Sequence, residues 1–162
     1  MNYTQESWPI RKLAELYEGK KLDLNPPYQR NPIWSSAAQK ALIETTLRRW
    51  PMPNLFLLLR AGEVFEVVDG KQRLRIILAF WRGHLEALDG RTIDSPSPIP
   101  RAQAIRDTFL SYLLSVTVVR NPAPDESIAK FYALVNSTGL RLNRPEIRQA
   151  GSCTTIGMKM RA

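Results

Sequence analysis

The segment VVDGKQRL, residues 67–74, combines the residue types that bind an anion at the start of a helix. An apolar run ends at Asp-Gly, and helical spacing of apolar side chains begins directly after it. A helix N-terminus gathers backbone N–H groups at the positive end of the helix dipole. Gly70 permits close backbone approach, and Lys71, Gln72 and Arg73 add donors. The segment therefore predicts a phosphate-binding turn, with a solvated Asp-Gly turn as the alternative.

A second polar segment, NPPYQRNPIW at residues 25–34, follows a short predicted strand. It places Gln29 and Arg30 beside the aromatic Tyr28 on a loop that prolines stiffen. Arginine suits bidentate contact with phosphate, and an aromatic ring suits stacking on a base. The alternative is a proline-rich connector whose aromatic side chains pack on the core.

A third segment, FYALVNSTGLRLNRPEIR, spans residues 131–148. Asn136 lies at the expected end of a helix, where it can also be a simple C-cap. Glu146 fits a capping box at the start of the next helix. Arg148 has no evident local role, which leaves its guanidinium available to a ligand.

Interleaved helices and strands must position these segments. The periodicity predicts helices over 9–19, 36–50, 71–82, 101–112 and 125–136, and strands over 54–60, 63–68 and 114–120. Ser36 is the expected N-cap of the second helix, and Gly19 the expected end of the first. Glu63 and Glu66 alternate with apolar positions, so both are expected to face solvent. The fold class is α+β, a small mixed sheet with surrounding helices in a single domain.

Composition narrows the class of protein. The chain has 162 residues and a net charge of +8, and 16 of its 23 basic residues are Arg. This predicts a phosphate-bearing partner, nucleotide or nucleic acid, and a simple compositional bias toward Arg is an equal alternative. A single Cys excludes multi-cysteine metal sites, and a single His, His84, excludes HExxH and HNH-type centres.

The ends and loops suggest a cytoplasmic protein of one domain. No apolar run approaches the roughly 20 residues of a membrane span, and residues 1–10 lack a signal-peptide pattern. The proline-rich stretch at 94–100 is expected to be an insertion loop rather than a domain boundary. The domain is expected over 1–150, and residues 151–162 are expected to form a poorly ordered tail.

Taken in order, PPYQRNPIW, VVDGKQRL and FYALVNSTGLRLNRPEIRQA resemble the N-terminal domain of GmrSD-type, modification-dependent restriction systems. The resemblance covers roughly residues 7–150 and implies a ParB/sulfiredoxin-like fold that binds, and in those systems hydrolyses, nucleoside triphosphates. Four motifs of the family correspond to residues of this chain. They are Asp69, Gly70, Lys71, Gln72 and Arg73 in the first, Tyr28, Gln29 and Arg30 in the second, Phe131 and Asn136 in the third, and Glu146 and Arg148 in the fourth.

The resemblance also implies roles for these residues. Asp69, Gln72 and Arg73 are the catalytic candidates, with Asp69 as the ligand of a Mg²⁺ ion. The nucleotide-binding candidates are Tyr28, Gln29, Arg30, Gly70, Lys71, Asn136 and Arg148. DNA and a separate nuclease subunit are the expected partners beside the nucleotide, and self-association is compatible with them.

Two departures from the family matter. Lys71 stands where the family usually has Gln, which adds charge and removes an acceptor. The HNH-type nuclease part is not evident, since one His cannot supply it, so the chain is expected to be a minimal version, a fragment or a degenerate copy without nuclease activity. The alternative to a nucleotide-binding module is a non-catalytic module that binds DNA or protein, in regulation, defence or anti-defence.

Overall fold

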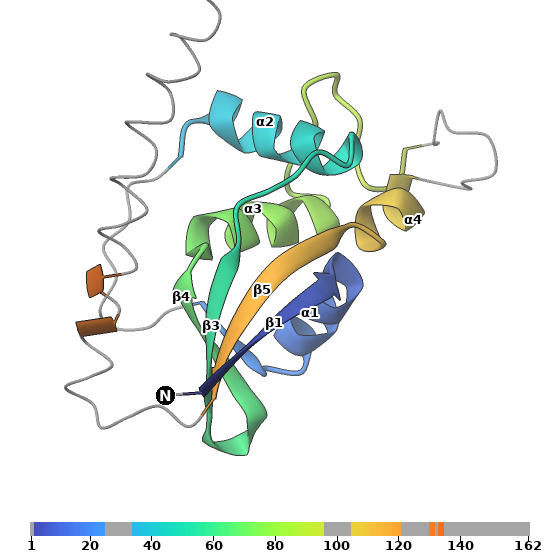
Figure 1. Cartoon of the computed structure of the whole chain (residues 1–162). Helices are drawn as coiled ribbons and strands as arrows, with labels where there is room; N and C mark the ends of the chain where they lie inside the picture. The colour runs from blue at the N-terminus through green and yellow to red at the C-terminus, as the bar shows by residue number, and fades with distance from the viewer. Residues whose placement is uncertain (1, 25–33, 96–104, 121–129, 132, 135–162) are drawn as a thin grey trace, which may run out of the picture. The chain divides into compact units, whose positions relative to one another are not determined.

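The computed structural model describes residues 2–24, 34–95, 105–120, 130–131 and 133–134 (Figure 1). The chain divides into two compact units, residues 1–122 and 123–162. In the second unit, residues 130–131 and 133–134 are helical, within the helix predicted over 125–136.

The described part of the first unit is a small mixed α/β domain, and this confirms the predicted mixed sheet with surrounding helices. Its elements are β1 (Asn2–Pro9), α1 (Ile10–Glu18), β2 (Leu22–Asp23), α2 (Ser36–Leu47), β3 (Leu55–Arg60), a 3-10 turn (Ala61–Glu63), β4 (Val64–Asp69), α3 (Lys71–Trp81), α4 (Ile105–Leu110) and β5 (Leu113–Arg120). Within the described residues, no helix is long and apolar enough to cross a membrane.

The five strands form one sheet in the order β1-β5-β3-β4-β2. Strand β3 lies at the centre, antiparallel to β4 and parallel to β5. Parallel strands need a crossover between them, and the connection from β3 to its parallel neighbour β5 contains β4, α3 and α4. This connection sets α3 against the sheet, directly after the end of β4.

One face of the sheet builds the core with the helices. Strands β3, β4 and β5 contribute alternate apolar side chains, and α1, α3 and α4 contribute the facing stripe (Figure 1). Helix α2 packs on α3 and α4. The largest fully buried side chains of this core are Trp8, Phe80, Phe109, Ile10, Leu13, Ile43, Leu55, Leu57, Leu74, Ile77 and Ile93.

The chain segment at 96–104 falls between two elements of the same unit. The backbone N–H of Ile105 donates to the carbonyl of Ser95 at 3.1 Å, so the two described ends of the segment lie side by side. Both flanks contribute to one core, which agrees with an insertion loop and not with a domain boundary.

Strand β1 was not expected from the sequence. Its residues NYTQES are polar and mostly exposed, so no apolar alternation marks them. Pairing with β5 makes them a strand, because residues 2–9 run antiparallel to residues 113–120. Trp8, the last residue but one of the strand, lies in the core. Its Nε1 donates to Glu6 Oε2 at 2.7 Å.

The predicted start of α2 is shifted by one residue, whereas Gly19 is the C-cap of α1, as predicted. The N-cap of α2 is Ser35 rather than Ser36, and its Oγ accepts from the N–H of Ala38 at 3.2 Å. At the end of α1, Gly19 keeps a φ of −73°, and Lys20 takes the left-handed conformation at 56°. The carbonyl of Lys21 accepts from Phe65 of β4 at 2.7 Å, so pairing with the sheet decides where the chain leaves α1.

The prediction that Glu66 faces solvent is wrong. Its side chain is buried, and Oε2 accepts from Arg60 Nε at 2.6 Å. Alternation in β4 does not separate core from solvent here, because Leu58, Val68 and Val119 are buried on the same face of the sheet as Glu66. Glu63, in contrast, is exposed as predicted.

Candidate functional site

The junction between β4 and α3 holds the predicted phosphate-binding turn. Gly70 is the N-cap of α3, and no side chain caps the helix there. The first intrahelical bond runs from the N–H of Leu74 to the carbonyl of Gly70 at 2.9 Å. The three preceding N–H groups therefore have no acceptor within the helix and mark its positive end.

Gly70 is required at this junction for two reasons. Its φ of 94° lies in the left-handed region, which side chains disfavour. A Cβ added there would lie 2.2 Å from Cδ2 of Leu55, a fully buried side chain at the start of β3. The close approach that Gly70 permits is therefore an approach of α3 to β3.

The guanidinium of Arg73 makes hydrogen bonds to acceptors of the protein itself. Its guanidinium donates to the carbonyl of Pro53, to the carbonyl of Asn54 at 3.2 Å and to Asp69 Oδ2 at 3.1 Å. Its side chain is 10% exposed. Burial lowers the pKa of Arg73, and the Asp69 carboxylate opposes that shift. Arg73 thus ties the entry of β3 to the exit of β4 and orients Asp69.

Lys71 is the first residue of α3, so it adds a cationic side chain to the start of that helix. The residue is only 7% exposed, and within the described chain its ammonium makes no hydrogen bond or ion pair. Burial lowers the pKa of Lys71, Arg75 lowers it further, and Asp23 opposes the shift. Burial of the Lys71 side chain disfavours its charged form, and a bound anion would favour that form.

Asp69 and Gln72 complete the described part of the turn. The Asp69 side chain is 39% exposed, and one of its oxygens accepts from Arg73. Gln72 is half-buried. Among the residues that the structure describes, no three Asp, Glu, His or Cys side chains come together as a metal site. Asp69 can therefore serve Mg²⁺ only together with other ligands, as when the ion is shared with phosphates.

Five predicted site residues lie outside the described ranges. Tyr28, Gln29, Arg30, Asn136 and Arg148 belong to this group, so their part in the site remains a prediction. Within 67–74, the structure brings Asp69, Gly70 and Arg73 into contact with one another.

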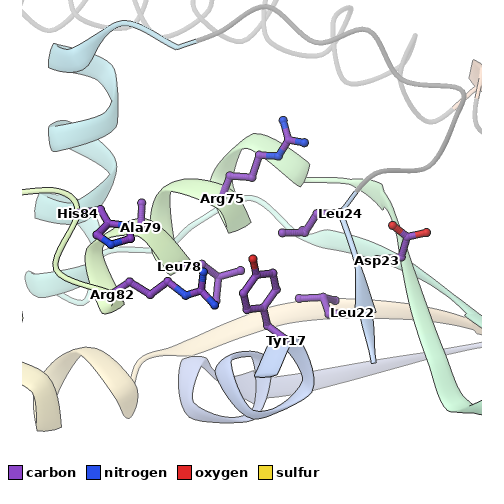
Figure 2. A pocket seen from close by; sticks show the side chains of 9 residues that line it. All are labelled: Tyr17, Leu22, Asp23, Leu24, Arg75, Leu78, Ala79, Arg82 and His84. Carbon is purple, nitrogen blue, oxygen red and sulfur yellow. The ribbon is translucent and has the colours of Figure 1, made fainter. Parts of the chain in front are cut away.

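A pocket beside α3 was missed by reasoning from the sequence (Figure 2). It has a volume of about 410 Å³ and lies between the end of α1, β2 and the outer face of α3. Its lining residues are Tyr17, Leu22, Asp23, Leu24, Arg75, Leu78, Ala79, Arg82 and His84. One feature of the sequence indicates this pocket: the spacing of Lys71, Arg75 and Arg82 puts three cations on one face of a helix.

The end of α3 orients two of the pocket's polar side chains. Gly83 has a φ of 77°, and its N–H donates to the carbonyl of Phe80 at 3.0 Å. The N–H of His84 donates to the carbonyl of Ala79 at 2.9 Å, which completes a Schellman-type end. His84 is exposed at the rim, as predicted, and Arg82 lies over the Tyr17 ring at 4.6 Å from its centroid.

Comparison with known proteins gives one match. A family model described as "GmrSD restriction endonuclease, N-terminal domain" matches residues 13–151. The matched span contains the β4–α3 turn and all three polar segments. Searches of curated proteins and of solved structures found no match.

Proposed function

The chain belongs to the GmrSD restriction endonuclease N-terminal domain family, and from this premise we propose that it is a nucleotide-binding module of a restriction-based defence system. The turn between β4 and α3 is the proposed phosphate site. A ParB/sulfiredoxin-like fold and a cytoplasmic location belong to the same proposal. The mixed sheet with a helix that starts directly after β4 supports the fold.

The observation that carries the proposal is the buried Lys71 beside an uncapped helix start. Three N–H groups of α3 lack intrahelical acceptors, and Lys71 adds a positive charge with no acceptor in the described chain. A phosphate group at this helix start would accept hydrogen bonds from the N–H groups and from the Lys71 ammonium. This combination supports a phosphate site over a solvated Asp-Gly turn.

Each residue of the turn has a proposed role. Lys71 and the N–H groups of α3 hold the phosphates, and Gly70 lets the helix start there. Asp69 would help to hold a Mg²⁺ ion, and such an ion would neutralise charge during phosphoryl transfer. Gln72 orients a water molecule for hydrolysis. Arg73 is a positioning residue, because it holds Asp69 and the entry of β3.

Residues of the other two polar segments, which lie outside the described ranges, complete the proposed site. Leu24 precedes residues 25–33 directly, and Leu24 lies beside α3 in the neighbouring pocket. Tyr28, Gln29 and Arg30 are therefore proposed to clamp the nucleotide from that side. Asn136 and Arg148 are proposed as further nucleotide ligands on the resemblance alone.

The test is titration calorimetry with ATP, GTP, CTP and UTP, each with Mg²⁺. We expect at least one triphosphate to bind, and Lys71→Met to weaken its affinity about tenfold to a hundredfold, since a hydrogen bond to a charged group contributes about 1.5–3 kcal/mol. Release of inorganic phosphate measures hydrolysis in the same samples.

Lys40→Met is the matched control for this titration, because Lys40 lies on α2 outside the turn and the pocket. The control should leave the affinity within about twofold of the original. No binding of any triphosphate at millimolar concentration would refute the proposed function, and equal loss in the two variants would refute the role of Lys71.

DNA and a nuclease are the proposed macromolecular partners. The family description names a restriction endonuclease, and the chain has a net charge of +8 with 16 arginines. Charge-driven binding to DNA releases counterions, so affinity falls steeply with salt. The affinity for duplex DNA, measured by gel shift, should fall by about tenfold or more between about 50 and 200 mM salt. A shift that is absent or insensitive to salt would favour a module that binds protein only.

A further inference from the structure

We propose that the pocket beside α3 binds the nucleoside part of the nucleotide whose phosphates bind at the start of that helix. This inference rests on the proposed function and adds the site that distinguishes a nucleotide from a bare polyphosphate. It assigns ligand-binding roles to Tyr17, Ala79 and Arg82, which lie outside the three polar segments.

The pocket and the phosphate turn share one face of α3. Residues 71, 75, 78 and 82 follow the helical repeat, so Lys71 and the pocket residues Arg75 and Arg82 lie along one stripe. Lys71 and Arg75 are close enough for Arg75 to lower the pKa of Lys71. Ala79 lies eight residues from Lys71, about 12 Å along the helix axis. A triphosphate chain with its ribose spans a distance of this order.

The inner wall of the pocket is apolar and contains a gap. Leu22, Leu24 and Leu78 are buried in the core and present their edges to the pocket (Figure 2). The small side chain of Ala79 leaves space in the pocket, between the larger pocket residues Arg75 and Arg82. The volume of about 410 Å³ falls in the usual range for small-molecule sites, which combine apolar walls with a few polar groups.

Arg82 and Tyr17 form a preorganised stacking platform. The guanidinium carbon of Arg82 lies 4.6 Å from the centroid of the Tyr17 ring, and both side chains line the pocket. A guanidinium held on an aromatic ring keeps a second flat face, and a base stacks well on such a face. This platform favours a planar aromatic ligand over a small inorganic anion.

The polar groups at the rim match the remaining parts of a nucleoside. Asp23 is an acceptor for an amino or hydroxyl donor, and His84 lies at the opposite end (Figure 2). Arg75 lines the pocket and lies within electrostatic range of Lys71, so it is proposed to contact the phosphate next to the ribose. The charges facing the pocket are Arg75, Arg82 and Asp23, so the pocket stays net positive.

The experiment compares two probes on the full chain. One probe is the series ATP, GTP, CTP and UTP with Mg²⁺, and the other is inorganic tripolyphosphate, which has no nucleoside. Ala79→Phe fills the gap in the pocket without a change of charge. We expect it to weaken the best triphosphate about tenfold or more, since a stacked base contributes on this scale, and to leave tripolyphosphate within about twofold.

Ala37→Phe on the exposed side of α2 is the matched control, and it should change neither affinity. Arg82→Ala is the second test, because Arg82 is exposed and its loss is expected to leave the fold intact. It should also weaken the triphosphate selectively. If thermal unfolding shows that Ala79→Phe does not fold, the result for Arg82→Ala decides.

The outcomes separate this inference from the proposed function. Unchanged triphosphate affinity in the folded pocket variants, with binding lost in Lys71→Met, would overturn the nucleoside pocket and leave the phosphate site in place. Equal affinity of the unmodified chain for tripolyphosphate and for every triphosphate would overturn it too. No binding of either probe would overturn both proposals.

Discussion

Gly70→Ala is expected to destabilise the protein by about 2–5 kcal/mol, with about 1–2 from the left-handed backbone and about 1–3 from overpacking. The new Cβ would lie 2.2 Å from Leu55 Cδ2. Leu55 is fully buried in the core, so its side chain has little room to move away. Chemical denaturation of the two proteins measures the difference.

Gly62→Ala is the matched control for Gly70→Ala. Gly62 also has a positive φ, 73°, but an added Cβ would meet no atom within 4 Å. It therefore isolates the backbone cost, about 1–2 kcal/mol. A double-mutant cycle with Leu55→Ala sharpens the test, because removing Cδ2 should reduce the cost of Gly70→Ala to that of the control. A cost at Gly70 equal to that at Gly62 in the unmodified background would refute the steric argument.

Arg73→Ala is expected to destabilise the protein by about 3–5 kcal/mol, the scale for breaking a buried ionic network by removing one partner. The substitution strips donors from the carbonyls of Pro53 and Asn54 and from Asp69. Arg73→Lys keeps the charge but cannot reproduce the planar fork, so it should recover only part of the loss. Denaturant midpoints of the three proteins order these effects.

Lys71→Met separates stability from ligand binding at the same turn. Burial disfavours the charged form of Lys71, so removal of the charge should keep or raise the stability of the unliganded protein. Since burial lowers the pKa of Lys71, this cost falls as the pH rises through that lowered pKa, and the variant should lack the dependence. Loss of stability in Lys71→Met comparable to that in Arg73→Ala would contradict these two assignments.

The variants Arg73→Ala and Lys71→Met test different roles within the motif Asp-Gly-Lys-Gln-Arg. Reasoning from the sequence treated Lys71 and Arg73 alike, as donors in the first turn of a helix. In the structure Arg73 supports the fold around the turn, and Lys71 remains the cation without an acceptor in the described chain. A loss of nucleotide binding in Arg73→Ala therefore tests the fold first, and only Lys71→Met tests the phosphate contact directly.

Local signals were enough to predict much of the described architecture. The apolar runs at 54–60 and 63–68, the Asp-Gly turn and the helix after it correspond to β3, β4 and α3. These features depend on the chemistry of neighbouring residues, namely turn residues, periodicity and capping, and so they can be seen without the fold. The three ordered polar segments identified the family, and the match over 13–151 confirms it.

Only the tertiary structure decided which distant residues meet. Strand β1 exists because β5 pairs with it, and Glu66 lies on a sheet face where Leu58 and Val68 are buried as well. Arg73 finds its acceptors near residue 53, and the pocket joins the end of α1 and β2 to α3. These contacts follow from the strand order β1-β5-β3-β4-β2, which brings together segments far apart in the chain. Local propensity has no information on such pairings, because they are stabilised by long-range packing and hydrogen bonds.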